Sequence, residues 1–113
     1  QLLGKWGEEA AAKLLSQAGY QIITKNYRCR QGEIDIIASD KETLVFVEVK
    51  LRTGLRFGRP EEAVNFQKLE KIKKTGLEFW KRAALPFKKA RIDVVSLYFN
   101  AGRLEGKIIK AVD

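Results

Sequence analysis

The chain contains no histidine, no methionine and only one cysteine among its 113 residues. The absence of histidine excludes hydrolases in which a His base activates a Ser or Cys nucleophile. Cys29 cannot form an internal disulfide, and it offers a soft metal ion such as zinc only one thiolate. Any metal site should therefore use the oxygen atoms of Asp and Glu, which suit Mg²⁺ or Mn²⁺.

Long hydrophobic runs and a signal-like leader are also missing. The phosphate-binding pattern G-x-x-x-x-G-K-[ST] is absent as well, which excludes the nucleotide hydrolases that depend on it. Together with the lone cysteine, these absences predict a cytoplasmic protein with no membrane partner. A length of 113 residues with 45% hydrophobic content predicts a single globular domain over residues 1–113.

The most informative residues are two charges inside an apolar run. Residues 44–50 read LVFVEVK, so that Glu48 and Lys50 interrupt a segment typical of a strand buried on both faces. A carboxylate is stable in such a place only when it is paired or binds a metal. Asp35, in the strand-like segment 33–39, completes a D-x12-E-x-K pattern. We therefore expect the chemistry of the protein at these three residues.

A count across the predicted hairpin brings the two acids together. If Ser39 pairs with Leu44 across a four-residue loop, the numbers of facing residues sum to 83, and Asp35 faces Glu48. Facing residues hold their Cβ atoms about 4.5 to 5.5 Å apart, where like charges repel each other. A divalent cation would convert this repulsion into a binding site, with Mg²⁺ or Mn²⁺ as the best match.

A structural network is the alternative interpretation of the same residues. The register that faces Asp35 with Glu48 also faces Glu33 with Lys50, so Lys50 could bridge Glu33 and Glu48 without any metal. A structure in which Asp35 and Glu48 point to opposite faces of the sheet would exclude the metal site.

A second match to the pattern shows that spacing alone is weak. Asp93, Glu105 and Lys107 have almost the same separation. The turn at residues 100–102 places Glu105 near Tyr98, however, and leaves Asp93 about 17 Å away along its strand. We do not expect this second set to converge.

The positive charge of the chain is unevenly distributed. The net charge is +8, from 22 basic and 14 acidic residues, and the segment 50–91 alone carries 13 basic and 4 acidic residues. A basic surface beside a carboxylate site suits a phosphodiester backbone, although an ordinary solvated lysine face is the plain alternative. The predicted nucleic-acid-binding residues are Arg52, Arg56, Arg59, Gln67, Lys68, Lys71 and Lys74.

Apolar spacing and turn residues predict an α/β domain with the order α-β-β-β-α-β-β. The predicted elements are a helix over residues 4–18, strands over 20–28, 33–39 and 44–50, a long second helix, and a hairpin of strands 91–99 and 103–112. The second helix is expected to begin near Pro60 and to pack through an apolar stripe from Phe66 to Ala83. Trp6 and Trp80 are expected in the core.

Several short motifs resemble those of the YraN-like uncharacterised family. They are Gly7-Glu8-x-x-Ala11, Gly19-Tyr20, Asn26-Tyr27-Arg28, the segment Gly32 to Ala38, the segment Val45 to Arg52, Ala63-Val64, Lys68 and Asp93-Val94-Val95. That family in turn resembles the PD-(D/E)XK, or restriction-endonuclease-like, nucleases, and most closely the archaeal Holliday-junction resolvases. The resemblance implies a central mixed β-sheet flanked by helices.

The resemblance also implies a role for each site residue. Asp35 and Glu48 match the metal-binding acids, Lys50 matches the catalytic lysine, and Glu8 matches an accessory acid. An acid serving the helix dipole is the alternative for Glu8. The superfamily's proline is absent, because Ile34 precedes Asp35, but that proline varies widely.

The expected function is hydrolysis of DNA phosphodiester bonds with Mg²⁺ or Mn²⁺ as cofactor. Asp35, Glu48 and the Val49 carbonyl would hold one or two metal ions, and Lys50 would act electrostatically. Phosphate contacts carry little sequence information, so we expect selectivity for branched DNA structure. Cutting two strands needs two sites, which a homodimer would supply. The alternative is a non-catalytic nucleic-acid-binding or interaction module that retains the nuclease fold.

Overall fold

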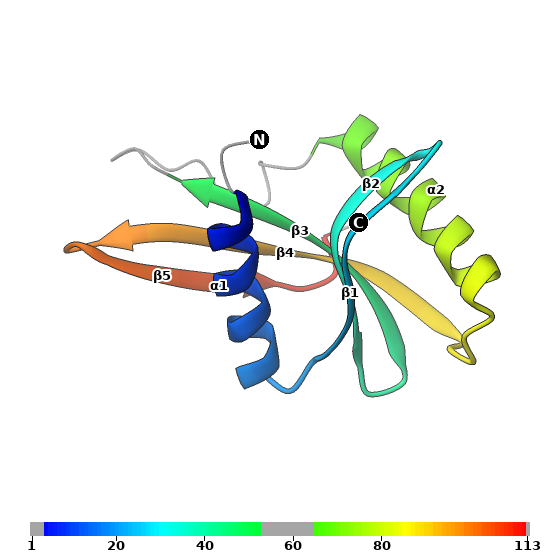
Figure 1. Cartoon of the computed structure of the whole chain (residues 1–113), viewed down its shortest axis with the longest axis horizontal. Helices are drawn as coiled ribbons and strands as arrows, with labels where there is room; N and C mark the ends of the chain where they lie inside the picture. The colour runs from blue at the N-terminus through cyan, green and yellow to red at the C-terminus, as the bar shows by residue number, and fades with distance from the viewer. Residues whose placement is uncertain (1–3, 53–64, 113) are drawn as a thin grey trace.

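The structure, a computed structural model, describes residues 4–52 and 65–112. Within these ranges, two helices and five strands follow in the predicted order α-β-β-β-α-β-β (Figure 1). Their bounds are α1 (Gly4–Gln17), β1 (Gln21–Cys29), β2 (Gly32–Asp40), β3 (Thr43–Arg52), α2 (Phe66–Ala83), β4 (Lys89–Asn100) and β5 (Arg103–Ile109). Neither helix is both long and apolar enough to cross a membrane.

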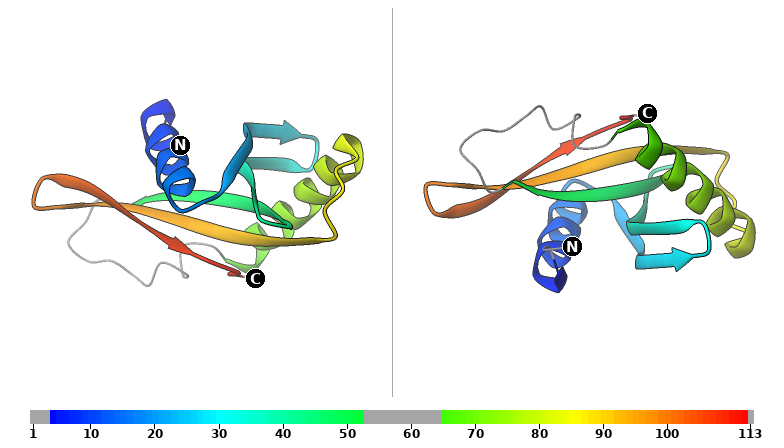
Figure 2. Two further views of the ribbon diagram at one scale, coloured as in Figure 1. Left: turned by 90° about the horizontal axis from the view of Figure 1, so that it is seen from below. Right: turned by 90° about the horizontal axis from the view of Figure 1, so that it is seen from above.

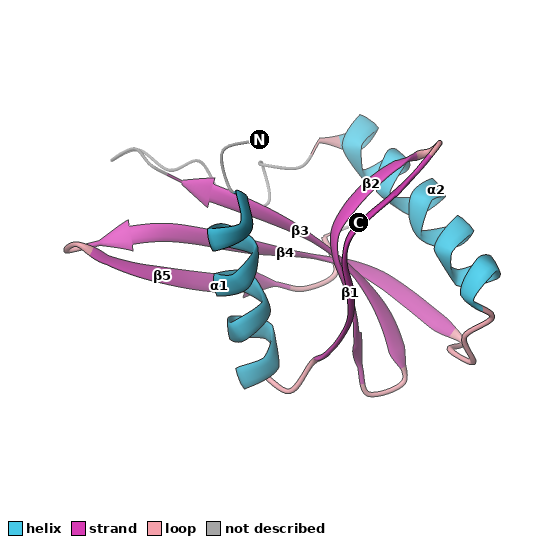
Figure 3. Ribbon diagram, viewed as in Figure 1, coloured by secondary structure: helices cyan, strands magenta, loops and turns pink. Residues whose placement is uncertain are grey.

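The five strands form one mixed sheet with the order β1-β2-β3-β4-β5 (Figure 3). Neighbouring strands are antiparallel except β3 and β4, which are parallel and are joined through α2. This arrangement of a mixed sheet with flanking helices fits the restriction-endonuclease-like fold. The predicted fold class is confirmed.

The two faces of β3 contribute to two separate hydrophobic clusters. Successive side chains of a strand point to opposite faces, so Val45 and Val47 pack with Leu15 of α1, whereas Leu44 and Phe46 pack on the side of α2. Figure 2 shows how strongly the sheet twists between the two helices, and how far the β4–β5 hairpin extends beyond α1. Both faces of the sheet centre are therefore covered, as the apolar run of β3 requires.

The second helix begins later than the sequence predicts. Asn65 has an extended backbone (φ −87°, ψ 174°), and its side chain accepts a hydrogen bond from the backbone N–H of Lys68 at 2.8 Å. Asn65 is therefore the N-cap of the helix, and α2 begins at Phe66 rather than near Pro60. Pro60 and the two acids that follow it lie outside the described residues.

The middle of α2 packs closely on the sheet. Ile72 is buried, and a Cβ atom on Gly76 would overlap the ring of Phe46. The absence of a side chain at Gly76 thus allows the helix to approach β3. Both ends of the predicted apolar stripe, Phe66 and Ala83, are exposed instead of packed.

Trp6 does not lie in the core, contrary to prediction. Its side chain is 50% exposed and stacks on Phe99 of β4, which is 49% exposed, with ring centroids 6.0 Å apart. The first turn of α1 thus meets the β4–β5 hairpin through this stacking, which leaves both residues about half exposed. Trp80, in contrast, is half-buried against the hydrophobic cluster on the α2 side of the sheet, here called the α2 cluster.

The register of the β2–β3 hairpin is the predicted one, but the two strands separate before the hairpin ends. Ser39 pairs with Leu44, and the ladder continues only to Ile36 opposite Val47. Beyond this pair, β2 stays with β1 while β3 stays with β4 along its whole length. The separation of β2 from β3 is plain in Figure 1. A fork thus opens in the sheet at Asp35, between the two predicted acids.

Candidate metal and nucleic-acid site

The Asp35 side chain bridges the fork between β2 and β3. Its Oδ2 atom accepts a hydrogen bond of 2.8 Å from the backbone N–H of Val49. The carboxylate thereby replaces a backbone acceptor that the departing strand no longer supplies. This bond fixes Asp35 beside Glu48, so the two acids meet, as the sequence predicts. The predicted role of the Val49 carbonyl stays a prediction.

Glu48 is a buried carboxylate with two lysine partners. Its side chain is only 7% exposed, and its Oε2 atom lies 2.7 Å from Lys68 Nζ and 3.4 Å from Lys50 Nζ. One lysine comes from the first turn of α2 and the other from the next outward position of β3. The N-cap at Asn65 starts the helix at the point that brings Lys68 over the fork.

Asp35 and Glu48 are two like charges in a partly buried site. Burial raises the pKa of Asp35 from its ordinary 3.8 to about 7, and the adjacent charge of Glu48 acts in the same direction. The Val49 N–H opposes this shift. Burial lowers the pKa of Lys68, but its hydrogen bond to Glu48 and the charges of both acids outweigh burial and leave the pKa raised. Asp35 therefore takes up a proton more readily than an ordinary aspartate, whereas Lys68 keeps its positive charge beside the pair.

Both acids open into a pocket of about 490 Å³ between β2, β3, α1 and α2. Its lining also includes the predicted residues Glu8, Gln67, Lys68 and Lys71. Further lining residues, which the sequence did not predict as site residues, are Asn26, Arg28, Gly32, Glu33, Asn65 and Ile72. The pocket therefore combines carboxylates at its base with basic side chains at its wall.

Glu8 reaches this pocket from α1. Its Oε1 atom accepts a hydrogen bond of 2.8 Å from Asn26 Nδ2 on β1. Asn26 has a left-handed backbone (φ 56°), which asparagine tolerates better than most residues. Glu8 lies beyond the first turn of α1, where the helix dipole has little effect. Its position does not suit the dipole alternative, and the accessory role stays a prediction.

One predicted contact of the site is wrong. Glu33 does not face Lys50, because β2 and β3 have already separated at this level, and Glu33 instead pairs with Arg28 of β1 at 3.3 Å. The predicted network in which Lys50 bridges Glu33 and Glu48 is therefore replaced. Lys68 takes the second position on Glu48.

The predicted nucleic-acid-binding residues divide into three groups. Gln67, Lys68 and Lys71 line the carboxylate pocket. Lys74 lies one turn further along α2, in a hollow of about 680 Å³ that Lys81 and Arg82 share. Arg52 ends β3, whereas Arg56 and Arg59 lie outside the described residues.

The donor set suits Mg²⁺ or Mn²⁺. Within the ranges 4–52 and 65–112, no cluster of three or more acidic, His or Cys side chains is positioned to hold a metal ion. Mg²⁺ does not need such a cluster, since it commonly binds through one or two carboxylates and keeps several waters. Two adjacent carboxylates, of which Glu48 raises the pKa of Asp35, fit this requirement.

The family of the chain follows from its sequence matches. The family described as "Uncharacterised protein family UPF0102" matches residues 7–97, which include the fork, both acids and most of the sheet. The chain belongs to this family. The match agrees with the resemblance seen in the short motifs.

Relatives within UPF0102 are similar over almost the whole chain. A UPF0102 protein of Syntrophus aciditrophicus is 49% identical over 107 residues, which cover 95% of this chain and 84% of the relative. One of Nocardia farcinica is 47% identical over 102 residues, covering 90% and 80%. The structure of Pyrococcus furiosus SfsA in complex with Ca²⁺ aligns with 93% of this chain and 59% of its own, at 11% identity. Its TM-score of 0.31 is too low to support an argument.

Proposed function

We propose that this protein is a metal-dependent nuclease that hydrolyses phosphodiester bonds of DNA, with Mg²⁺ or Mn²⁺ as its cofactor. The observation that carries the proposal is the pair of half-buried Asp35 and buried Glu48 at the fork of the sheet. Two adjacent carboxylates inside a fold are costly unless a ligand uses them. Lysines beside the pair supply positive charge where a phosphate would enter.

Each residue has a distinct part in the proposed reaction. Asp35, oriented by the Val49 N–H, and Glu48 would provide oxygen ligands for the cation. A divalent cation bound there would supply an activated water and neutralise charge on the phosphate. Lys50, at 3.4 Å from Glu48, stabilises negative charge that develops on the phosphate oxygens. Lys68 stands at the pocket wall and is placed to contact the same phosphate.

The basic surface beside the pocket holds the DNA backbone. Lys71 and Lys74 continue from the carboxylates along α2, and Arg52 lies at the end of β3. Contacts of this kind recognise phosphates rather than bases, so the protein selects branched DNA by shape. Cutting both strands at a branch needs two sites, which a homodimer would provide.

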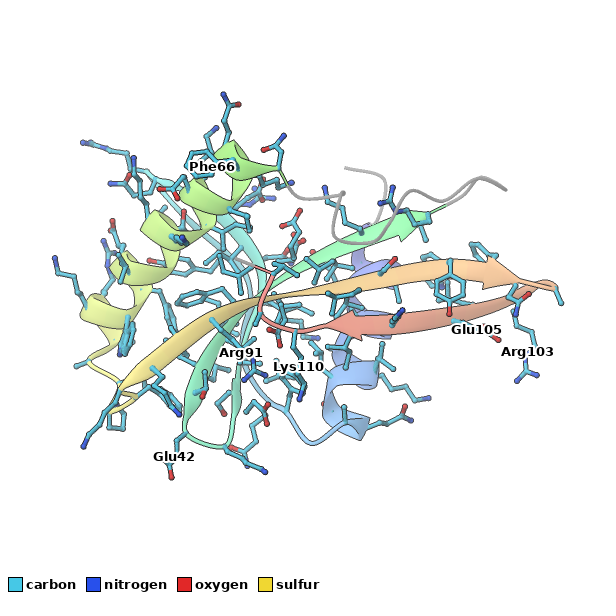
Figure 4. The ribbon with its side chains drawn as sticks, turned by 180° about the vertical axis from the view of Figure 1, so that it is seen from behind. Glu42, Phe66, Arg91, Arg103, Glu105 and Lys110 are labelled. Atoms are coloured by element: carbon cyan, nitrogen blue, oxygen red, sulfur yellow. The ribbon has the colours of Figure 1, made fainter. Side chains whose placement is uncertain are left out.

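A cleavage assay tests the proposal. Wild-type protein is incubated with labelled linear, flapped and four-way-junction DNA and Mg²⁺ or Mn²⁺, beside Asp35→Ala and Lys50→Ala. We expect cleavage by the wild type and its loss in both variants, while Lys50→Ala retains metal affinity. Glu42→Ala is the matched control, because Glu42 is an exposed acid at the opposite end of the same hairpin (Figure 4). Cleavage that persists in Asp35→Ala would contradict the proposal.

A specific observation favours a non-catalytic nucleic-acid-binding module as the second candidate. Lys68 and Lys50 both form ion pairs with Glu48, which satisfy its charge within the protein. This candidate predicts that DNA binding is insensitive to Mg²⁺ and unchanged in Asp35→Ala, with no cleavage by any variant. The same assay therefore separates the two candidates.

A further inference from the structure

The sheet face that carries Glu48 continues past α2 onto β4 and β5. On this face the α2 cluster includes Val94 of β4, with Ile109 of β5 packed against it. Glu48 pairs with Val94, and Val94 pairs with Ile109, so these three positions form one row across the sheet. The next rows outward lie beyond the cluster that α2 covers.

Those outer rows are polar and mainly basic. Because alternate residues share a face and paired residues lie side by side, the register places further side chains on the face of Glu48. The first row is Lys50, Ser96 and Lys107, the second is Arg52, Tyr98 and Glu105, and the third is Asn100 and Arg103. Four cations thus follow the carboxylate site in order, Lys50 and Arg52 on β3 and Lys107 and Arg103 on β5, with Glu105 as the acid among them.

The outermost cations are open to solvent. Lys107 and Arg103 are both exposed, and Figure 4 shows Arg103 and Glu105 near the outer end of the β4–β5 hairpin. Glu105 accepts a hydrogen bond from Asn100 at 3.3 Å. Lys107 lies two strands from Lys50, about 10 Å across the sheet, and about 13 Å along β5 from Arg103. This spacing suits a long polyanion better than a single small anion.

We infer that this face of the β4–β5 hairpin is a second surface for the DNA backbone. The inference deepens the proposed nuclease function and rests on it. The lysines of α2 lie on the β2 side of the carboxylates, and Lys107 and Arg103 lie on the β5 side. DNA whose phosphate enters the pocket therefore contacts cations on both sides of the bond to be cut.

The distribution of charge along the sequence does not predict this basic surface. Residues 92–113 carry 3 basic and 3 acidic side chains, a net charge of zero. One of the acids, Asp93, points to the opposite face and is fully buried there. The pairing of β3 with β4 and of β4 with β5 is what brings Lys107 beside Lys50.

Binding measured without cleavage tests the inference. Fluorescence anisotropy of labelled four-way-junction DNA is followed in EDTA over a range of salt concentrations, with Lys107→Ala and Arg103→Ala. Each variant should bind about fivefold more weakly near 0.15 M salt. The magnitude of the slope of log affinity against log salt should fall by about 0.9, since the loss of one phosphate contact reduces the number of counterions released on binding. Lys13→Ala is the control with the same charge change, because Lys13 is exposed on α1.

The turnover of the two variants gives a second readout. With Mg²⁺ present, Lys107→Ala and Arg103→Ala should raise KM and leave kcat unchanged, since they lose ground-state binding only. Thermal melting by circular dichroism confirms that each variant is folded. If both variants bind junction DNA as the Lys13→Ala control does, the inference is wrong while the proposed nuclease function stands. If the wild type binds no DNA, both are wrong.

Discussion

The carboxylate of Asp93 and the pair of carboxylates at the fork differ in how their charge is satisfied. Asp93 is fully buried and accepts hydrogen bonds from Tyr20 Oη at 2.7 Å, from Arg91 Nε at 2.9 Å and from the Ala111 N–H at 2.9 Å. At the fork, two acids share one pocket and repel each other. A carboxylate with a complete set of donors is a structural element, whereas a repelling pair is a candidate ligand site.

The Asp93 centre joins four parts of the chain. Arg91 also binds Asp40 at 2.7 Å, at the end of β2, and Tyr20 connects the α1–β1 turn. Lys110, beside Arg91 in Figure 4, lies 3.6 Å from the same Asp40. Burial and the bond to Asp93 raise the pKa of Tyr20 to about 12, so its hydroxyl remains a donor. These features explain why Asp93, although part of the second sequence match, does not belong to a site with Glu105.

Removal of Asp93 should have the largest effect on stability. Asp93→Ala leaves Arg91 and Tyr20 without their buried partner, so the free energy of unfolding should fall by about 3 to 5 kcal/mol. Urea denaturation followed by circular dichroism measures this change. An Asp93→Ala protein as stable as the wild type would contradict the structural role.

Mg²⁺ should stabilise the folded protein by binding at the fork, and it should not bind at the Asp93 centre. A cation that binds only the folded protein stabilises it by about 2.7 kcal/mol at a concentration one hundred times its Kd. The melting temperature should therefore rise with Mg²⁺ in the wild type and stay constant in Glu48→Gln. A similar rise in the Glu48→Gln variant would place the cation elsewhere.

The pH dependence of stability should distinguish the two centres in metal-free buffer. The raised pKa of Asp35 means that the folded protein keeps a proton that the unfolded chain has lost, so stability should fall as pH rises from about 4 to about 7. We expect a loss of about 1 to 2 kcal/mol, because water in the pocket and the nearby lysines screen the charge.

Asp35→Asn should abolish this fall, as measured by urea denaturation at a series of pH values. The Asp40 carboxylate contributes the opposite trend, since its bond to Arg91 lowers its pKa and is lost in acid. A stability profile that is identical in the wild type and Asp35→Asn would show that Asp35 is not the titrating group.

The exposed ion pair at the pocket rim should have the smallest effect. Arg28 and Glu33 are 75% and 64% exposed, and such pairs contribute between zero and about 1 kcal/mol. Glu33→Gln should change stability by less than about 0.5 kcal/mol. A loss as large as that of Asp93→Ala would mean that the rim, rather than the buried centres, holds this end of the sheet together.

The sequence predicted the parts of the fold that depend on local pattern. The alternation of residues 33–39 and the apolar run 44–50 determine the strands, and a short loop determines the pairing of Ser39 with Leu44. The meeting of Asp35 with Glu48 follows from that register. The separation of β2 from β3 does not, because it depends on β3 pairing with β4, and for this reason the Glu33–Lys50 contact was wrong.

The remaining differences have tertiary causes. Lys68 was predicted as a DNA contact, and its bond to Glu48 arises only once α2 packs over the fork. The start of α2 at Phe66 could have been inferred from Asn65, a favourable N-cap residue, but Pro60 gave the stronger helix-start signal. Trp6 is exposed because it stacks on Phe99, which is itself exposed, and hydrophobicity alone does not reveal this arrangement.

Direct measurement of metal binding tests the central claim, that the fork is a cation site. Mn²⁺ is titrated into the wild type and into Asp35→Asn at neutral pH, and free Mn²⁺ is followed by electron paramagnetic resonance. We expect the wild type to bind Mn²⁺ and Mg²⁺ to compete with it, while Asp35→Asn binds far more weakly. Equal Mn²⁺ binding by the two proteins would contradict the assignment of the site to Asp35 and Glu48.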